Sequence, residues 1–178
     1  MNALTPKARP VIAAVLLATL PGSAQAATVP LRSLLESGPG NLGSIRLDGN
    51  YFVVSKKAGA KSLLLGVASD GLYLNRVDTV FVAAQKEYLT PEERSVFRRA
   101  VIDVALKCFN LRAERQTAIN TWLDRQNASA LRDVRTDFGP MTLRFIRQLS
   151  DDGQYWTLVR LSRTGKPGVS PWLNYCTP

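Results

Sequence analysis

Arginines and one tryptophan alternate with apolar residues between positions 141 and 163, where the chain has its clearest strand pattern. Arginine binds carboxylate and phosphate groups through several N–H donors, and an aromatic ring can stack on a planar ligand. The pattern predicts a surface that binds an anionic partner, with Arg144, Arg147, Trp156 and Arg160 as candidate binding residues. The alternative is the solvated polar face of an antiparallel sheet whose other face is core.

The whole chain is basic, with 23 Lys and Arg against 14 Asp and Glu and a net charge of +9. Without residues 1–26, which are discussed below, 21 basic residues remain against 14 acidic ones, which leaves +7. Such a surplus favours an acidic partner, either a protein or an anionic component of the cell surface. Because the surplus is spread evenly along the chain, it indicates a solvated basic surface more than a dedicated binding patch, and we do not expect nucleic acid as the partner.

Cys108 and Cys176 are the only cysteines. An even number of cysteines in an exported protein usually forms disulfides, so these two are predicted to be bonded to each other. Two free thiols or a bridge to another molecule are the alternatives. A catalytic thiol would need an activating base, and the chain contains no histidine.

The lack of histidine also excludes a Ser-His-Asp triad and zinc bound by imidazole. Paired carboxylates for glycoside hydrolysis are compatible with the sequence, because only their separation in space decides whether they can act together. We therefore expect a binding protein that is not an enzyme and needs no cofactor or metal. A small carboxylate-dependent hydrolase of the cell envelope and a structural or assembly accessory of the envelope are the alternatives.

Residues 1–26 are typical of a secretory signal peptide. Two basic residues precede an apolar run over residues 11–20, and Ala24-Gln25-Ala26 forms a small-x-small cleavage site. A run of ten residues is too short to span a bilayer as a helix. The sequence thus predicts an exported protein, periplasmic or extracellular, with residues 27–178 as one α+β domain that has no transmembrane segment.

Residues 90–109 are predicted to form the central helix. Thr90 suits the N-cap, Pro91 the first helical position, and Glu93 completes a capping box. Apolar residues recur at helical spacing on one side, and Cys108 lies on that side near the helix end. A second helix over residues 111–126 follows after a short connection, which predicts an antiparallel pair.

The pattern D-G-x-Y occurs three times, beginning at Asp48, Asp70 and Asp152. Asp-Gly between strand-like runs is a strong hairpin signal. Three hairpins are therefore predicted, which join residues 44–47 to 51–56, 63–69 to 72–77, and 141–149 to 155–162. Residues 79–84 are compatible with either strand or helix.

The predicted fold class is α+β, with an antiparallel sheet of about six strands from three hairpins, packed on one side by two antiparallel helices. Residues 171–178 are expected to dock as a final strand held by the disulfide. The sequence gives no indication of the oligomeric state.

Overall fold

The computed structural model describes residues 26–37, 41–48, 51–70, 75–130 and 133–178. Seven antiparallel strands form the main sheet, in the spatial order β2-β3-β4-β5-β8-β7-β6. Their bounds are β2 Asn41–Asp48, β3 Tyr51–Ala58, β4 Lys61–Asp70, β5 Thr79–Ala84, β6 Asp133–Phe138, β7 Met141–Leu149 and β8 Tyr155–Arg163. The predicted α+β class with an antiparallel sheet is confirmed, with one strand more than the six or so expected. The predicted signal peptide lies outside the described residues except for Ala26.

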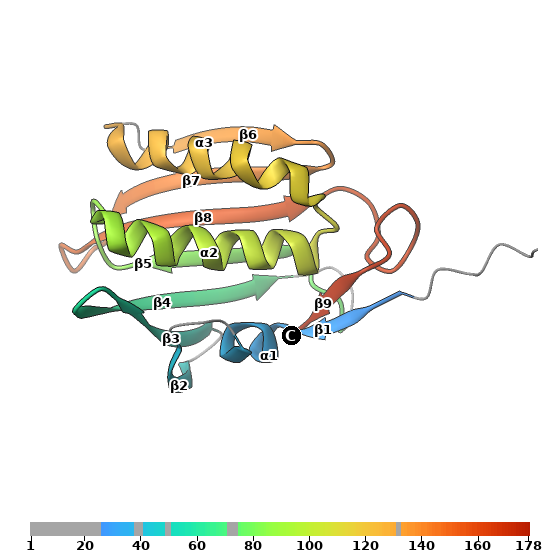
Figure 1. The fold of residues 1–178 in the computed structure, drawn as a ribbon, viewed down its shortest axis with the longest axis horizontal. Helices are drawn as coiled ribbons and strands as arrows, with labels where there is room; N and C mark the ends of the chain where they lie inside the picture. Colours follow the sequence, from blue (N-terminus) through green and yellow to red (C-terminus); the bar gives the residue numbers. More distant parts are fainter. Residues whose placement is uncertain (1–25, 38–40, 49–50, 71–74, 131–132) are drawn as a thin grey trace, which may run out of the picture.

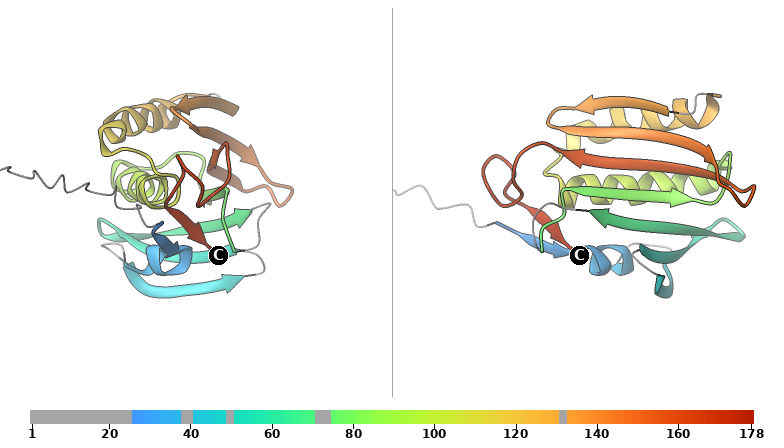
Figure 2. Two further views of the ribbon diagram at one scale, coloured as in Figure 1. Left: turned by 90° about the vertical axis from the view of Figure 1, so that its right-hand side faces the viewer. Right: turned by 180° about the vertical axis from the view of Figure 1, so that it is seen from behind.

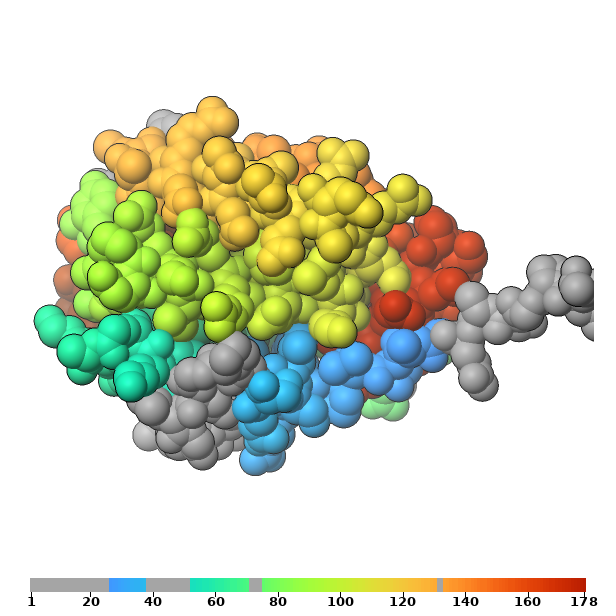
Figure 3. All heavy atoms as spheres, in the orientation of Figure 1, coloured from blue at the N-terminus to red at the C-terminus, as the bar shows by residue number. Residues whose placement is uncertain are grey.

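Three helices cover one face of this sheet: α1 (Leu31–Ser37), α2 (Pro91–Cys108) and α3 (Gln116–Ala128). A short 3-10 helix, Ala113–Arg115, leads into α3. Figure 1 shows α2 and α3 running in opposite directions along the sheet, as predicted, and Figure 3 shows the side that the helices cover. On the other side the strands lie bare of any described helix (Figure 2, right). None of the described helices combines the length and the apolarity that a membrane span requires.

Two of the three predicted hairpins have the predicted strands. β2 pairs with β3, and β7 pairs with β8 through a turn in which Gly153 adopts a φ of 77°, a conformation that favours glycine. The second hairpin differs, because the register partners of β4 on its far side are Thr79–Ala84 and the predicted partner strand was 72–77, of which residues 72–74 lie outside the described residues. The tips at residues 49–50 and 71–74 lie outside the described residues.

β5 is a strand because its side chains alternate between the two faces of the sheet. Val80, Val82 and Ala84 are fully buried on the helix side, whereas Phe81 and Ala83 are only partly buried on the other side. A β-branched segment of this kind fits the centre of a sheet, where β5 lies between β4 and β8.

The core lies between the sheet and the helices. On α2 the predicted apolar side is buried, with Phe97, Val101, Val104, Ala105 and Cys108 each 2% exposed or less. On α3 the Trp122 ring makes edge contacts with Phe138 and Phe145, at centroid distances of 6.0 and 6.5 Å. Aromatic pairs of this geometry add to the apolar burial that fixes α3 over β6 and β7.

The predicted Cys108–Cys176 disulfide is present and joins the end of α2 to the C-terminal tail, with the two Cα atoms 4.7 Å apart. The tail forms β9 (Tyr175–Thr177), but β9 pairs in parallel with β1 (Thr28–Pro30) and not with the main sheet. The indole of Trp172 stacks on Phe109 and donates a hydrogen bond of 2.9 Å to the Cys108 carbonyl. The disulfide therefore brings both ends of the described chain against the end of α2.

The predicted capping box at the start of α2 is also present. Thr90 and Glu93 bond each other's backbone N–H groups reciprocally, and Lys86 donates to Glu93 at 2.6 Å. Burial alone would raise the pKa of Glu93, but the hydrogen bonds from Lys86 and Thr90 outweigh it and lower the pKa.

Glu93→Gln is expected to lower the free energy of unfolding by about 1 kcal/mol at neutral pH, because Gln can keep the capping hydrogen bond but loses the charge-assisted bond from Lys86. The pKa of Glu93 is lowered on folding from its ordinary value of 4.5, so its contribution is present above that value and is lost as the pH falls through the folded-state value. Urea titrations of both proteins at pH 7 and at about pH 3 check this, and the difference between them should close at the lower pH. A difference that does not change with pH would contradict this role for the carboxylate.

Candidate functional site

The candidate binding residues lie on two opposite faces of the β7–β8 hairpin. Along β7 the side chains of Met141, Leu143, Phe145 and Arg147 are buried on the helix side. Successive residues of a strand alternate between faces, so Arg144, three positions from Arg147, lies on the uncovered face. Trp156 and Arg160 of β8 lie on the uncovered face as well, each paired with a residue of the same face. The structure thus brings Arg144 and Arg160 together and separates Arg147 from them.

Three arginines form a row across the uncovered face. Arg135 of β6 is the register partner of Arg144, and Arg144 is the partner of Arg160. The row ends at Phe81 of β5, whose ring lies 5.5 Å from the guanidinium carbon of Arg160. Because neighbouring strands are about 4.8 Å apart, the backbones of the three arginines span only about 10 Å. We call Arg135, Arg144 and Arg160 the arginine row.

Aspartates on β6 offset part of this charge. Asp133 accepts two hydrogen bonds from the Arg144 guanidinium, which lower the pKa of the Asp133 carboxyl and raise that of Arg144. Asp137 lies 3.7 Å from Arg135. Among the described residues no carboxylate pairs with Arg160, and its Nε atom is buried without a hydrogen-bond partner. Arg160 is therefore the cation in the row that the described chain leaves without a counterion.

The arginine row borders a shallow hollow of about 470 Å³. Thr142, Ser162, Arg163 and Thr164 also line this hollow, so hydroxyl-bearing residues and part of Arg163 adjoin the three guanidinium groups of the arginine row. The Arg163 guanidinium itself lies on the helix side of the sheet, where it donates a hydrogen bond to the Phe109 carbonyl and lies over the Trp172 ring. Burial lowers the pKa of Arg163. Trp156 is four residues from Arg160 along β8, about 13 Å away, and does not line the hollow.

Arg147 is 1% exposed and is bound by backbone carbonyl groups on the helix side. Its three guanidinium nitrogens donate to the carbonyl oxygens of Glu87 at 2.6 Å, Ser129 at 2.5 Å and Asn127 at 3.2 Å. Two of these carbonyls belong to the C-terminal end of α3, where a cation also interacts favourably with the helix dipole. Arg147 thus holds the end of α3 against the sheet, and the surface proposed below does not include it.

The two carboxylates that line the helix-side cleft are too far apart to act together in glycoside hydrolysis. Glu92 and Asp103 both line a cleft on the helix side. They are eleven residues apart on α2, about 16 Å along the axis, whereas the carboxyl pairs of glycosidases are about 5–10 Å apart. In the described ranges no three acidic or cysteine residues are grouped so that they could hold a metal ion.

No family model, no curated protein and no solved structure matches this chain. The site is therefore defined by its own geometry. The candidate binding residues predicted from the sequence do not include Arg135 or Arg163, and the polar segment around Arg135 has a weaker strand pattern than residues 141–163. The alternation of Asp133, Arg135 and Asp137 with Val134 and Thr136 is the signal that marks an edge strand with one charged face.

Proposed function

We propose that this chain is an exported, disulfide-bonded binding protein whose uncovered sheet face binds an acidic segment of a partner protein. The observation that carries the proposal is the arginine row, with like charges on three adjacent strands. Like charges directly opposite one another destabilise a sheet pair. Asp133 and Asp137 offset only part of this charge, and an anionic group bound beside Arg160 would supply the counterion that the described chain does not.

The apolar residues beside the row favour a protein as the partner. Two residues along each strand from the row, the same face carries the apolar residues Ala83 of β5, Leu158 of β8 and Ile146 of β7. Leu158 is the register partner of both Ala83 and Ile146. Trp156 extends this apolar part of the face towards the hairpin turn. Interfaces between proteins combine arginine and aromatic residues with partly apolar surroundings, whereas nucleic acid contacts depend chiefly on positive charge.

Two features support export. The disulfide between Cys108 and Cys176 is typical of oxidising compartments. The leader-like residues 1–26 are the expected route to such a compartment, either the periplasm or the extracellular space.

The test is quantitative capture with residues 27–178 as bait and an envelope extract of the source cells as the sample. The bait Arg135→Gln/Arg144→Gln/Arg160→Gln should lose at least about 10-fold of the captured partner, because a charge complement that steers and holds the complex is gone. The matched control replaces the exposed Arg112, Arg115 and Arg125 on the helix side with Gln and removes the same charge. This control should retain the partner.

The purified partner is then titrated at increasing salt. Binding to the wild-type chain should weaken steeply with ionic strength, and binding to the triple variant should depend on salt much less. Equal capture by the triple variant and the control would overturn the proposal, as would a captured component that is not a protein.

A further inference from the structure

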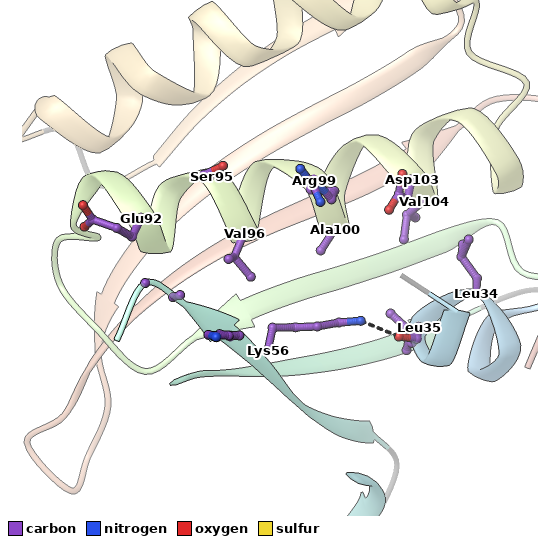
Figure 4. Close-up of a pocket in the computed structure, with 13 residues that line it drawn as sticks. Leu34, Leu35, Lys56, Glu92, Ser95, Val96, Arg99, Ala100, Asp103 and Val104 are labelled. Carbon is purple, nitrogen blue, oxygen red and sulfur yellow. Dashed lines mark hydrogen bonds between the residues drawn. The ribbon is translucent and has the colours of Figure 1, made fainter. Parts of the chain in front are cut away.

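A cleft of about 410 Å³ lies on the helix side of the sheet, between α1, α2 and the end of β3. Figure 4 shows α2 along one side, Lys56 of β3 along the other, and Leu34 and Leu35 of α1 at one end. Ser95 and Arg99 of α2 are exposed at its border. The cleft is separated from the arginine row by the thickness of the sheet, so the two sites are independent.

Lys56 contributes a buried positive charge to this cleft. Its side chain is 7% exposed, and its ammonium group donates one hydrogen bond, of 2.7 Å, to the Leu35 carbonyl. An ammonium group has three N–H donors. The other two have no partner among the described residues. Burial lowers the pKa of Lys56, and the charge of Asp103 opposes that effect.

Asp103 contributes the opposite charge from α2. No hydrogen bond or ion pair to this carboxylate is found among the described residues, although Arg99, Lys56 and Lys107 lie near enough to act on it electrostatically. Burial raises the pKa of Asp103. Lys56 and Asp103 therefore border one cleft, each partly desolvated, without forming an ion pair with each other.

Apolar side chains form much of the remaining wall of the cleft. Val96, Ala100 and Val104 recur at helical spacing on the side of α2 that borders the cleft, and Leu34 and Leu35 face them from α1 (Figure 4). Partly buried charged groups are stabilised by charged or hydrogen-bonding partners, and apolar walls by apolar ligand atoms.

We propose that the cleft binds a small zwitterion with an apolar side chain, either a free amino acid or a dipeptide. Its carboxylate binds the open N–H donors of Lys56, its ammonium group binds the Asp103 carboxylate, and its side chain packs on Val96, Ala100 and Val104. A ligand with a single charge would satisfy one of the two protein groups and leave the other partly desolvated and unpaired. The requirement for both charges is what distinguishes this ligand class from a fatty acid or a simple amine.

The volume of the cleft fits this class. A space of about 410 Å³ equals the bulk volume of about fourteen water molecules, at roughly 30 Å³ each. It therefore has room for a molecule of up to about fourteen non-hydrogen atoms, such as leucine or a small dipeptide.

Methyl-detected NMR titration of residues 27–178 with defined probes tests the proposal. The probes are leucine, alanyl-leucine, N-acetyl-leucine, which lacks the ammonium group, and leucinamide, which lacks the carboxylate. Leucine or alanyl-leucine should shift the methyl signals of Val96, Ala100 and Val104, and the stronger of the two identifies the source of the ligand. N-acetyl-leucine and leucinamide should each bind at least about 10-fold more weakly, because each leaves one partly desolvated charge unpaired.

Two variants assign the contacts. Lys56→Met and Asp103→Asn should each weaken the zwitterion at least about 10-fold. Arg115→Gln, which removes an exposed charge far from the cleft, should bind as the wild type does. Asp103→Asn keeps the side-chain shape, so it tests binding even if Lys56→Met perturbs the fold, which the amide spectrum of β6–β8 monitors.

Equal binding of leucine, N-acetyl-leucine and leucinamide would overturn the proposal. So would the absence of methyl shifts with leucine and alanyl-leucine at about 10 mM, or shifts that both variants leave unchanged.

Discussion

Removal of the Cys108–Cys176 bond is expected to lower the free energy of unfolding by about 4 kcal/mol, because the disulfide closes a long loop in the unfolded chain. The two cysteines are 68 residues apart in the sequence, and both are fully buried in the fold. For a chain of this size the change corresponds to a fall of roughly 8–16 °C in Tm. The double variant Cys108→Ala/Cys176→Ala avoids a buried hydroxyl group and is the suitable test.

Without the disulfide, the C-terminal tail should open locally under conditions in which the rest of the domain stays folded. β9 is only three residues long, and among the described strands only β1 pairs with it. Without the covalent link, the remaining attachments of the tail include the Trp172 contacts with Phe109 and the bond from the Val77 N–H to the Cys176 carbonyl, 2.9 Å long. Amide exchange in Tyr175–Thr177 should therefore accelerate well before the main sheet opens.

Thermal unfolding of oxidised wild type, reduced wild type and the double variant provides the comparison. The reduced wild type and the double variant should unfold at similar temperatures, and reductant should leave the double variant unchanged. A wild-type Tm that does not respond to reduction would contradict this role of the bond.

Features governed by local signals could be predicted from the sequence. The start of α2 follows from Thr90, Pro91 and Glu93, which satisfy the N-terminal N–H groups through side chains a few positions away. The third hairpin follows from Asp152-Gly153, because a tight turn needs a residue that accepts positive φ. The pairing of the two cysteines was predictable because the chain has no others.

Features that depend on distant contacts could not be read in the same way. The turn after β4 is signalled by Asp70-Gly71, but the strand that pairs with β4 starts at Thr79, and the choice is made by packing between β4 and β8. The cleft could not be predicted either, since nothing in the sequence relates Lys56 to Asp103 until α1, α2 and β3 pack together.

The faces of β7 were predictable, but grouping the arginines by nearness in the sequence obscured them. Arg144 and Arg147 are three positions apart, which is the same side of a helix but opposite sides of a strand. The buried series Met141, Leu143 and Phe145 continues to Arg147 in steps of two. Once the segment is read as a strand, this alternation assigns Arg147 to the core and Arg144 to the uncovered face.

Because Arg147 is buried and Arg144 lies on the uncovered face, replacing each with Met should affect stability very differently, although both lie on β7. Arg147→Met should lower the free energy of unfolding by about 3 kcal/mol or more, because the buried carbonyls of Glu87, Asn127 and Ser129 lose a donor. The loss includes stacking, since the Arg147 guanidinium lies 4.3 Å from the centre of the Tyr88 ring. Arg144→Met, on the exposed face, should leave the unfolding midpoint close to that of the wild type.

Arg147→Lys tests whether the positive charge or the shape of the guanidinium group stabilises this region. An ammonium group keeps the positive charge at the end of α3, but it cannot reproduce a planar guanidinium that donates to three carbonyls in different directions. The lysine variant should therefore recover only a minor part of the lost stability. Urea unfolding of all three variants measures these differences, and amide exchange at the α3 C-terminus reports whether that end has loosened. If Arg147→Met were no less stable than Arg144→Met, the carbonyl contacts would not be what holds α3 to the sheet.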